Sequence, residues 1–572
     1  MYLGIDVGGT HTDGVALEVT GRSARVVAAC KVKTRTDLLQ SIVSALRTLL
    51  QTVDAASVRQ LNLSTTLSTN AIVQARTEEV GMLVSAGPGI DPTTFQPCRH
   101  FHVVPGALDH RGREVDRLDT RAAKDAIRAC RADNVRVYAI VGKFSTRNPL
   151  HENTLRHLLC STDADATCEG ADFVTLGHTL SGRLGFPRRL ATAYFNAAVW
   201  RVFGGFATAV ESALAELGLG HIRVNILKAD GGTMPVSLAR RVPVQSIFSG
   251  PAASVMGIVA LCDIFHDSII LDIGGTTTDI AVFASGAPLI EPDGIPIGSH
   301  PTLVRALKVH SIGIGGDSAI GLVQGVVRVG PNRLGPSACL GGDHPTLCDA
   351  LNVAGHCAVG DVAASARALA AFAAAHALAP DDLADLAVTA AAQAIHVATR
   401  ELLDEINSRP VYTIHELLEN ARIVPKKIYL MGGPAEAMKM PIFGQFRLSC
   451  EVPPNFAVAN AIGAALTRTT TGIELFADTD KHVMLIPSLG HRENIPASYS
   501  LDDAIRDANN HLLAHLIDLR LARDAQRAEI THASSFNMVR GEHTVGRNIR
   551  VKCQIKPGVL ATLHEGGRGR NA

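Results

Sequence analysis

Hydrophobic residues along the chain recur with two periods, which alternate from the first residues onward. Short apolar runs predict buried strands at "YLGIDV", "DGVALEV", "VGMLVSAG" and "VRVYAIVGKF". Leu, Ile and Val recur at helical spacing in "DLLQSIVSALRTLLQTV", and "HENTLRHLLC" is a second amphipathic segment. This alternation favours an α/β fold, in which helices pack on layers of sheet.

The same alternation continues toward the C-terminus. A long helical region over residues 191–220 is predicted to be interrupted at Gly204 and Gly205, and two further helices are predicted on either side of Pro380. "KKIYLMGGP" indicates a strand and a Gly-Gly turn, and "VANAIGAALTR" indicates a helix of small residues. In the last hundred residues, "RDAQRAEITH" is compatible with a helix, "NIRVKCQI" indicates a strand, and "HEGGRGRNA" indicates a loose tail.

One phrase occurs twice, 266 residues apart. "DVGGTHTD" begins at Asp6 and "DIGGTTTD" begins at Asp272, each at the end of an apolar strand. A strand, a Gly-Gly turn and a second strand form a hairpin whose turn exposes backbone N–H groups, and such turns bind anions. The expected phosphate-binding residues are Gly8, Gly9, Thr10, Thr12, Gly274, Gly275, Thr276 and Thr277.

The two carboxylates at the start of the phrases, Asp6 and Asp272, are the candidates to hold Mg²⁺ through water. Neither copy is a P-loop or a dinucleotide-binding G-x-G-x-x-G opening a helix. The alternative is that both copies are structural hairpins of a duplicated fold. The repeat keeps Asp, Thr and Asp, which packing does not require, so phosphate binding is the favoured interpretation.

Composition narrows the class of partner. The 572 residues suggest three to four domain-sized units, and 54 Lys plus Arg balance 54 Asp plus Glu. This balance gives no electrostatic reason to expect nucleic acid or an anionic membrane, so small molecules are expected instead. We find no signal peptide or span-length apolar stretch in the sequence and expect a cytoplasmic protein. Eleven cysteines without a C-x-x-C pair favour reduced thiols.

A cluster of cysteines and histidines runs from Cys339 to Cys357, in "CLGGDHPTLCDALNVAGHC". Zinc could use such ligands, but the paired short spacings of zinc fingers and ribbons are absent. Buried thiols beside a loop are the favoured interpretation.

Four motifs occur in an order that resembles the actin, Hsp70 and sugar kinase superfamily. "DVGGTHTD" and "LDIGGTTTDI" resemble its two phosphate motifs, "YLMGGPAEAM" its adenosine motif and "NAIGAAL" its second connecting motif. "SGPAASVMGIVAL" would then be the first connecting helix. The resemblance implies two lobes, each built on a ribonuclease-H-like sheet, with ATP and Mg²⁺ in the cleft between them. It also implies that Gly432 and Gly433 contact the nucleoside.

Within that superfamily, the chain most resembles the hydantoinase A/5-oxoprolinase family, which includes N-methylhydantoinase A and the β subunits of acetone-type carboxylases. Motifs similar to the family's recur in order, among them "TTLSTNAI", "FSTRNPLHE", "ADGGTMP", "VHSIGIGGDSAI" and "VRVGPNRLGPSACLGG". The expected units are 1–190 with the first hairpin, 191–468 with the second hairpin and adenosine motif, and 469–572, a short C-terminal region.

The chain departs from the family's pattern in four places. Leu63 and Ser64 replace a usual His-Gly, and His11 replaces a usual Phe. Asp317 replaces a glycine in the family's Gly-Gly-Gly-Ser loop, which puts the substrate in doubt because a new carboxylate then lies beside the presumed substrate loop. The family's long C-terminal domain is shortened here.

The resemblance implies a function in which ATP phosphorylates the oxygen of an unreactive carbonyl. The expected activity is ATP-dependent hydrolysis of a cyclic amide such as a hydantoin, oxoproline or lactam, in an oligomer with a hydantoinase B-like partner subunit. Positioning and charge neutralisation do most of the work of phosphoryl transfer, and Asp6 and Asp272 are the expected organisers. A subunit of an ATP-dependent ketone carboxylase, a small-molecule kinase and a non-catalytic ATP-driven activator remain alternatives.

Candidates on the substrate side come from three motifs. His310 could polarise a carbonyl or act as a base, or it could be structural. Asp230 and Asp317 are comparable candidates, but either could instead cap a turn or a helix. Lys228 could pair with a phosphate or line a strand end. His151 and Glu152 are expected to begin a helix and to stabilise the fold.

Overall fold

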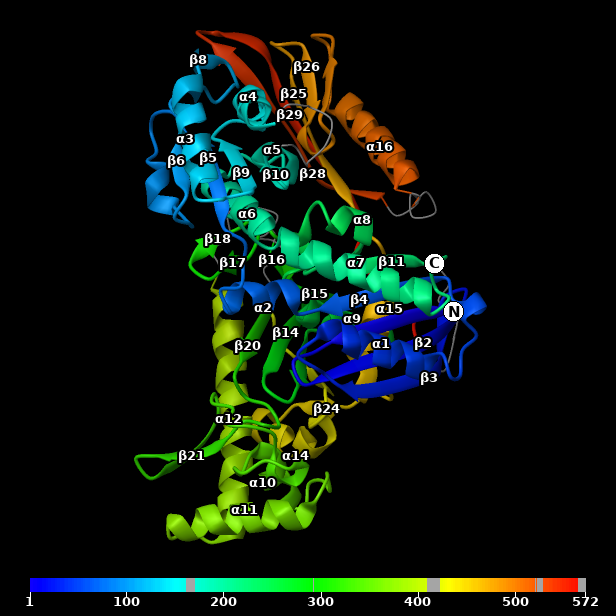
Figure 1. The fold of residues 1–572 in the computed structure, drawn as a ribbon. Helices are drawn as coiled ribbons and strands as arrows, with labels where there is room; N and C mark the ends of the chain where they lie inside the picture. The colour runs from blue at the N-terminus through cyan, green and yellow to red at the C-terminus, as the bar shows by residue number, and fades with distance from the viewer. Residues whose placement is uncertain (161–169, 292, 409–421, 520, 522–527, 564–572) are drawn as a thin grey trace.

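Two sheets of the same topology form the centre of the molecule, as the computed structural model shows (Figure 1). The structure describes residues 1–160, 170–291, 293–408, 422–519, 521 and 528–563. A third, smaller sheet and a C-terminal sheet lie together at one end of the molecule, and helices α10 to α12 extend from the other end (Figure 1).

The first sheet has the strand order β12-β11-β4-β1-β2-β3. Strands β1, β2 and β3 form an antiparallel meander, and β4 and β11 run parallel to β1. Its strands are β1 Tyr2–Val7, β2 His11–Thr20, β3 Ser23–Lys33, β4 Gln60–Thr65, β11 Arg223–Leu227 and β12 Thr233–Pro235. Because β1 lies between neighbours and under helices, all but one of its residues are buried, which explains its uninterrupted apolar run.

The second sheet repeats this order as β15-β14-β13-β23-β24. Strand β13 pairs with β14 antiparallel and with β23 parallel, as β1 pairs with β2 and β4. Its strands are β13 Ser268–Ile273, β14 Thr278–Ala284, β15 Ala287–Pro288, β20 Val309–Ile312, which also pairs with β14, β23 Lys427–Met431 and β24 Ser449–Glu451. The expected pair of ribonuclease-H-like sheets is therefore confirmed.

Two helices cross between the sheets with their backbones in close contact. Helix α9 spans Ser249–Leu261 and α15 spans Ala459–Leu466. A Cβ placed on Gly463 would overlap the carbonyl oxygen of Ala253, and one placed on Gly257 would overlap that of Ala459. Glycine is required at both positions because only a hydrogen fits between the two backbones.

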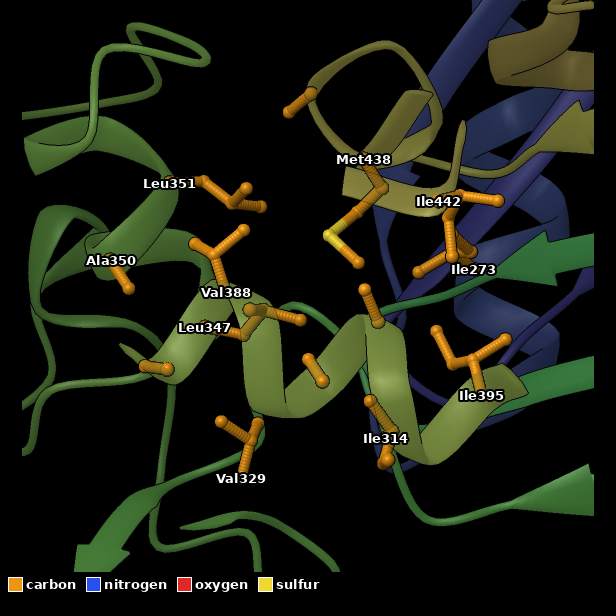
Figure 2. Close-up of a cluster of buried hydrophobic side chains, with 14 of the residues drawn as sticks. Ile273, Ile314, Val329, Leu347, Ala350, Leu351, Val388, Ile395, Met438 and Ile442 are labelled. Carbon is orange, nitrogen blue, oxygen red and sulfur yellow. The ribbon is translucent and has the colours of Figure 1, made fainter. Parts of the chain in front are cut away.

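Helices of the second lobe bury the largest apolar cluster of the protein. Helices α10 (Leu347–Val353), α11 (Val362–Ala375), α12 (Pro380–Asn407) and α14 (Ala435–Phe446) pack beside β13 and β14. Figure 2 shows part of the cluster, including Ile273, Val388, Ile395 and Met438. Ile273 directly precedes the second Gly-Gly turn, so this core supports one side of the cleft.

A four-stranded parallel sheet, β10-β9-β5-β6, is inserted between β4 and β11. Its elements are α2 Leu67–Val73, β5 Val80–Ser85, β6 Phe101–Val103, α3 Thr120–Ala132, β9 Val137–Gly142, α4 Leu150–Leu159, β10 Phe173–Leu176, α5 Gly177–Leu180 and α6 Phe186–Ala198. Helix α1 (Leu38–Leu49) and helix α7 (Trp200–Glu216), which follows α6, cover one face of the first sheet.

The C-terminal region forms the five-stranded antiparallel sheet β27-β26-β25-β29-β28, covered by α16. Its elements are β25 Gly472–Asp478, β26 Val483–Ile486, β27 His491–Asn494, α16 Leu501–Asp518, β28 Ala528–Arg540 and β29 His543–Ile555. The region packs on the inserted sheet, where Arg147 lies 3.2 Å from the centre of the Phe476 ring and Arg111 pairs with Asp478 and Asp480.

Two expectations about local structure need correction. The break in residues 191–220 falls at Val199, between α6 and α7, while Gly204 and Gly205 continue the helix. Glycine weakens a helix by only about 1 kcal/mol, which the buried Phe203 and Phe206 outweigh. The segment compatible with a helix at 523–532 is strand from Ala528 onward, because its backbone pairs with that of β29. Its first five residues and the expected tail lie outside the described residues.

The predicted domain limits stay a prediction, and strands β11 and β12 cross them. Strand β11 lies after residue 190, yet it pairs with β4 in the first sheet. Residues near 80–200 form the inserted sheet instead.

No single helix in the described part of the chain is both long and apolar enough to cross a membrane. Helices α11 and α12 pass that test only together, as a pair bent by 97°.

Candidate active site

The two repeated phrases form two hairpins of the same geometry. In the first, Asp6 lies opposite Asp13, and the Gly8 N–H donates to the His11 carbonyl at 3.1 Å. In the second, Asp272 lies opposite Asp279, and the Gly274 N–H donates to Thr277 at 2.8 Å. The repeat in sequence is therefore a repeat in structure.

The turns of the two hairpins lie against each other across the cleft. A Cβ on Gly275 would lie 3.1 Å from the Thr10 hydroxyl and 3.4 Å from Asp317 Oδ2. The loop at 313–318 rests on the second turn, since the Gly316 and Asp317 N–H groups donate to the Gly274 and Gly275 carbonyls at 2.9 and 2.7 Å. The structure thus brings both predicted turns and the predicted substrate loop together.

The carboxylates of Asp6 and Asp272 are buried between the lobes, 6% and 8% exposed. Asp272 Oδ2 accepts hydrogen bonds from Ser254 of α9 at 2.5 Å and from Asn460 of α15 at 3.2 Å. Burial raises the pKa of both carboxyls, that of Asp6 to about 7, and the charges of Asp13 and Asp272 raise the pKa of Asp6 further. These groups are poised to bind a cation, which would favour their ionised forms.

Two further carboxylates complete the group, and the sequence analysis gave them no role. Asp13 pairs with Lys31 at 2.9 Å, and Asp279 accepts a hydrogen bond from Ser311. Burial, and then the charge of Asp272, raise the pKa of Asp279 to about 7. Both residues end the repeated phrase, so the repeat itself contained the signal. Ser254 and Asn460 carried no such signal.

One predicted phosphate ligand needs correction. Thr12 is fully buried and its hydroxyl lies 3.0 Å from that of Thr34, which donates its own proton to the Gly8 carbonyl at 2.9 Å. Thr12 is therefore the donor to Thr34 and has no proton left for a phosphate. Its counterpart Thr278 likewise donates to Ile314. Both hydroxyls therefore stabilise the hairpins through hydrogen bonds within the protein.

The other predicted phosphate ligands surround the cleft. Gly9 has open space where a Cβ would be, and Thr10 and Thr276 are half-buried. Gly8, Gly274, Gly275 and Thr277 lie in the same two turns.

The predicted nucleoside turn also lies at the cleft. Gly432 follows β23, which is parallel to β13, so it lies at the same sheet edge as Asp272. It has φ +88°, and a Cβ there would lie 2.6 Å from Asp272 Oδ1. Gly433 has free space around it.

His310 is not brought to the carboxylates. It is exposed on β20, while its neighbour Ser311 contacts Asp279. Because side chains alternate along a strand, His310 points to the opposite side from Ser311.

Asp317 lies in the cleft and caps no helix. Its Oδ1 accepts from the Ser337 hydroxyl at 2.9 Å and its Oδ2 pairs with Arg333 at 3.0 Å. The segment after it continues into strand β21 (Ile320–Val323), so the expectation of a cap on this segment is wrong. The charge of Asp317 also acts on His11 of the first hairpin, where burial lowers the histidine pKa.

Asp230 closes the turn between β11 and β12. Its Oδ1 accepts from the Gly232 N–H at 3.0 Å, and its Oδ2 pairs with Lys228 at 3.3 Å. The geometry matches the turn-capping alternative.

His151 and Glu152 begin α4 and stabilise the inserted sheet, as expected. His151 lies 2.9 Å from the Ser85 hydroxyl and 3.0 Å from Glu114. Glu152 is fully buried and accepts from the Gly142 N–H at 2.7 Å and from both the backbone and ring of His178.

The cysteine cluster at 339–357 is organised by a buried carboxylate. Asp349 accepts hydrogen bonds from the Cys339 N–H at 2.9 Å and from Thr346. Cys339 and Cys348 are free thiols with sulfurs 3.8 Å apart. In the described part of the chain, the groups close enough to share a metal ion lie elsewhere.

The four carboxylates at the hairpins, those of Asp6, Asp13, Asp272 and Asp279, fit a divalent cation. The four carboxylates lie close together. Among the described residues, the Lys31 ammonium is the one that pairs with them, through Asp13. Buried negative charge of this kind is costly unless a cation neutralises it. The adjoining glycine turns present backbone to the cleft and suit a phosphate.

The two lobes, each built on a ribonuclease-H-like sheet, and the cleft between them define an actin-like fold. Residues 2–162 match the profile of the hydantoinase/oxoprolinase N-terminal region, and residues 189–472 match that of hydantoinase/oxoprolinase. The chain belongs to the hydantoinase/oxoprolinase family.

Curated relatives agree with this assignment. The chain is 23% identical over 413 residues to 5-oxoprolinase of Saccharomyces cerevisiae, covering 61% of this chain and 31% of the relative. It is 22% identical over 386 residues to 5-oxoprolinase 1 of Arabidopsis thaliana, covering 58% and 29%. The chain thus spans about a third of the length of these relatives.

Two solved structures share the fold over most of their length. The ATP-dependent caprolactamase of Pseudomonas jessenii is 19% identical with a TM-score of 0.67, covering 100% of this chain and 89% of that one. Nucleotide-free acetone carboxylase is 17% identical with a TM-score of 0.66, covering 97% and 87%.

Proposed function

We propose that this chain uses ATP to phosphorylate the carbonyl oxygen of a cyclic amide, which is then hydrolysed at its C–N bond. The observation that carries the proposal is the pair of facing hairpins with the carboxylates Asp6 and Asp272 buried between them. The relatives named for cyclic amides, 5-oxoprolinase and caprolactamase, support this substrate class.

The described residues have separate roles in this proposal. Asp6 and Asp272 hold Mg²⁺, with Asp13 and Asp279 beside them, and the ion supplies charge neutralisation for phosphoryl transfer. The turns at 8–10 and 274–277 bind the phosphates through backbone N–H groups, and Gly432 and Gly433 contact the nucleoside. Ser254 and Asn460 orient Asp272 by hydrogen bonds.

Phosphorylation solves a chemical problem of the amide. The nitrogen lone pair makes the carbonyl carbon a poor electrophile, and transfer of the γ-phosphoryl group to oxygen removes that stabilisation. Water then adds to the carbon, and the ring C–N bond breaks as the nitrogen takes up a proton, which leaves an acyl phosphate. A second water attacks the acyl carbon, and phosphate leaves with the original carbonyl oxygen. His310 and Asp230 remain proposals on the substrate side, although their side-chain contacts do not place them beside Asp272.

We propose that a hydantoinase B-like subunit completes the reaction in an oligomeric assembly. About two thirds of the 5-oxoprolinase relative has no counterpart in this chain. A second polypeptide that corresponds to this remainder would supply the hydrolytic site.

The test is ATP turnover with a substrate panel. Purified chain with ATP and Mg²⁺ is given hydantoin, 5-oxoproline or caprolactam, with and without the candidate partner, and ADP is measured. We expect one cyclic amide to stimulate ADP release, and an ¹⁸O label in its carbonyl to appear in inorganic phosphate. No stimulation by any cyclic amide, with the partner present, contradicts the proposal.

Ketone carboxylation is a second candidate, which the equally similar acetone carboxylase structure favours. Acetone with bicarbonate belongs in the same panel, and stimulation by that pair alone selects this candidate. A phosphorylated product that accumulates with the isolated chain identifies a kinase, and ATP turnover that no small substrate changes identifies an ATP-driven activator.

A further inference from the structure

A group of metal-binding side chains lies in the inserted sheet, at the edge formed by β6. His100 directly precedes β6, His102 is in the strand, and Cys130 is on α3. One ring nitrogen of each histidine and the Cys130 sulfur all lie within 4.8 Å of one another. His100 and His102 alternate with Phe101, so both imidazoles lie on the same side of the strand, facing α3.

One ring nitrogen of each histidine is withdrawn from water and makes no hydrogen bond. The Nε2 atoms of both histidines are buried and neither makes a hydrogen bond. His100 is 7% exposed and Cys130 is fully buried. A buried polar atom that makes no hydrogen bond is costly, so two such nitrogens beside a thiol indicate a missing ligand.

We propose that His100, His102 and Cys130 bind a structural Zn²⁺ ion. Imidazole nitrogen and thiolate sulfur are the donors that zinc prefers. Ligand atoms of a tetrahedral zinc are about 3.3–3.8 Å apart, given bond lengths of about 2.0–2.3 Å, so small side-chain movements close the site.

Glu79 is the fourth ligand. Its Oε2 lies 3.3 Å from His100 Nε2, and the residue directly precedes β5. One thiolate and one carboxylate neutralise the two charges of the ion, so the complete site carries no net charge. Zinc would then connect β5, β6 and α3, three segments that meet at the open edge of the inserted sheet.

A cavity lies beside Glu79, one of the proposed ligands. It has a volume of about 410 Å³, and its lining includes Glu79 and Asp133. Asp133 Oδ2 lies 3.8 Å from the second ring nitrogen of His100, Nδ1. Metal-bound histidines commonly direct their other nitrogen at a carboxylate, which sets the tautomer.

A second group, His491, Glu493 and His511, also has its ligand atoms within 4.8 Å of one another. Its side chains are more exposed, and His491 already hydrogen-bonds Glu493 at 3.3 Å. It therefore lacks the buried orphan nitrogens that carry the proposal, and it provides the control.

The experiment measures metal in the purified full-length chain. The protein is stripped with a chelator, given excess Zn²⁺, desalted, and analysed by inductively coupled plasma mass spectrometry. The variants are Cys130→Ser and His102→Ala. The controls are Cys98→Ser, a nearby cysteine that packs with Phe101 and Trp200 in a different apolar cluster, and His511→Ala.

We expect about one tightly bound zinc per chain in the wild type, Cys98→Ser and His511→Ala, and at least a tenfold loss of affinity in Cys130→Ser and His102→Ala. Co²⁺ in place of zinc should give a thiolate charge-transfer band that Cys130→Ser abolishes. Folded wild-type protein that binds neither Zn²⁺ nor Co²⁺ overturns the proposal, as does zinc whose loss follows His511→Ala. The wild-type result stands even where a variant fails to fold.

Discussion

Asn460 donates a hydrogen bond to Asp272 at 3.2 Å, and the same side chain lies against Asp6, where it favours the ionised form. One amide at the start of α15 thus serves carboxylates that come from both lobes. The two carboxylates that we propose as magnesium ligands are therefore coupled through a neutral side chain.

Asp272→Asn should reduce ATP turnover by about 100-fold or more while ATP affinity changes little. Asparagine keeps the size of the side chain but removes the charge that orders the metal, so the loss falls on phosphoryl transfer. Steady-state ADP release and nucleotide titration measure the two effects. Asp6→Asn should show the same loss of turnover. Asp125→Asn, at an exposed position on α3, is the matched control. Normal ATP turnover in both cleft variants would show that the hairpins have only a structural role.

The free energy of unfolding should fall as pH rises from 5 to 8 in the absence of metal. The folded-state pKa values of Asp6 and Asp279 are each about 7, above the ordinary value of 3.8. The native state therefore binds more protons than the unfolded state between about pH 4 and 7, and stability is lost across that window, on the order of 2 kcal/mol for each group.

Denaturant unfolding at several pH values measures this slope. Asp279→Asn should flatten the slope, and Mg²⁺ should stabilise the wild type more at pH 8 than at pH 5, because it binds the ionised carboxylates. Stability that is independent of pH in this window, with no metal present, contradicts the assigned pKa values.

Gly315→Ala should lower both turnover and stability. A Cβ at this position would lie 2.6 Å from the backbone of Gly275 and Thr276, so the loop must move off the second hairpin. We expect a cost of about 1–3 kcal/mol and at least a tenfold loss of ADP release. Gly321→Ala is the control, since nothing lies within 4 Å of that Cβ. Equal behaviour of the two variants would show that the loop does not position the turn.

Asp317→Gly should shift substrate preference toward anionic cyclic amides. The substitution removes a carboxylate from the cleft and releases the Arg333 guanidinium, which pairs with Asp317 at 3.0 Å. Turnover is compared for a neutral lactam and 5-oxoproline, and we expect the ratio to change by about tenfold. Adding Arg333→Ala should reverse the shift. Unchanged selectivity with lower stability would leave Asp317 as a structural residue of the loop.

The sequence predicted those parts of the molecule whose signal is local. Buried strands such as β1 and β13 are continuous apolar runs, and the two hairpins share the pattern of Asp, Gly-Gly-Thr and Thr-Asp. The membership of β11 in the first sheet was not predictable, because pairing with β4 depends on a partner more than 150 residues away.

The direction in which side chains point was the other feature that could not be predicted from the sequence. Thr12 and Thr10 are both threonines of one turn, yet Thr12 donates inward to Thr34 and Thr10 lies against Gly275. Only their positions in the strand register decide that Thr12 points inward and Thr10 points to the cleft. Ser254 and Asn460 were missed because helices α9 and α15 bring them to Asp272 from outside the repeated phrases.

The crossing of α9 and α15 has a mechanical consequence. The two helices touch backbone to backbone at Gly257 and Gly463, so they can rotate about that point more easily than they can slide past each other. Ser254 and Asn460 lie within one turn of this pivot and move little during such a rotation, whereas the hairpin tips are farther away and move more. Opening the lobes would therefore separate the two turns while the donors to Asp272 stay in place.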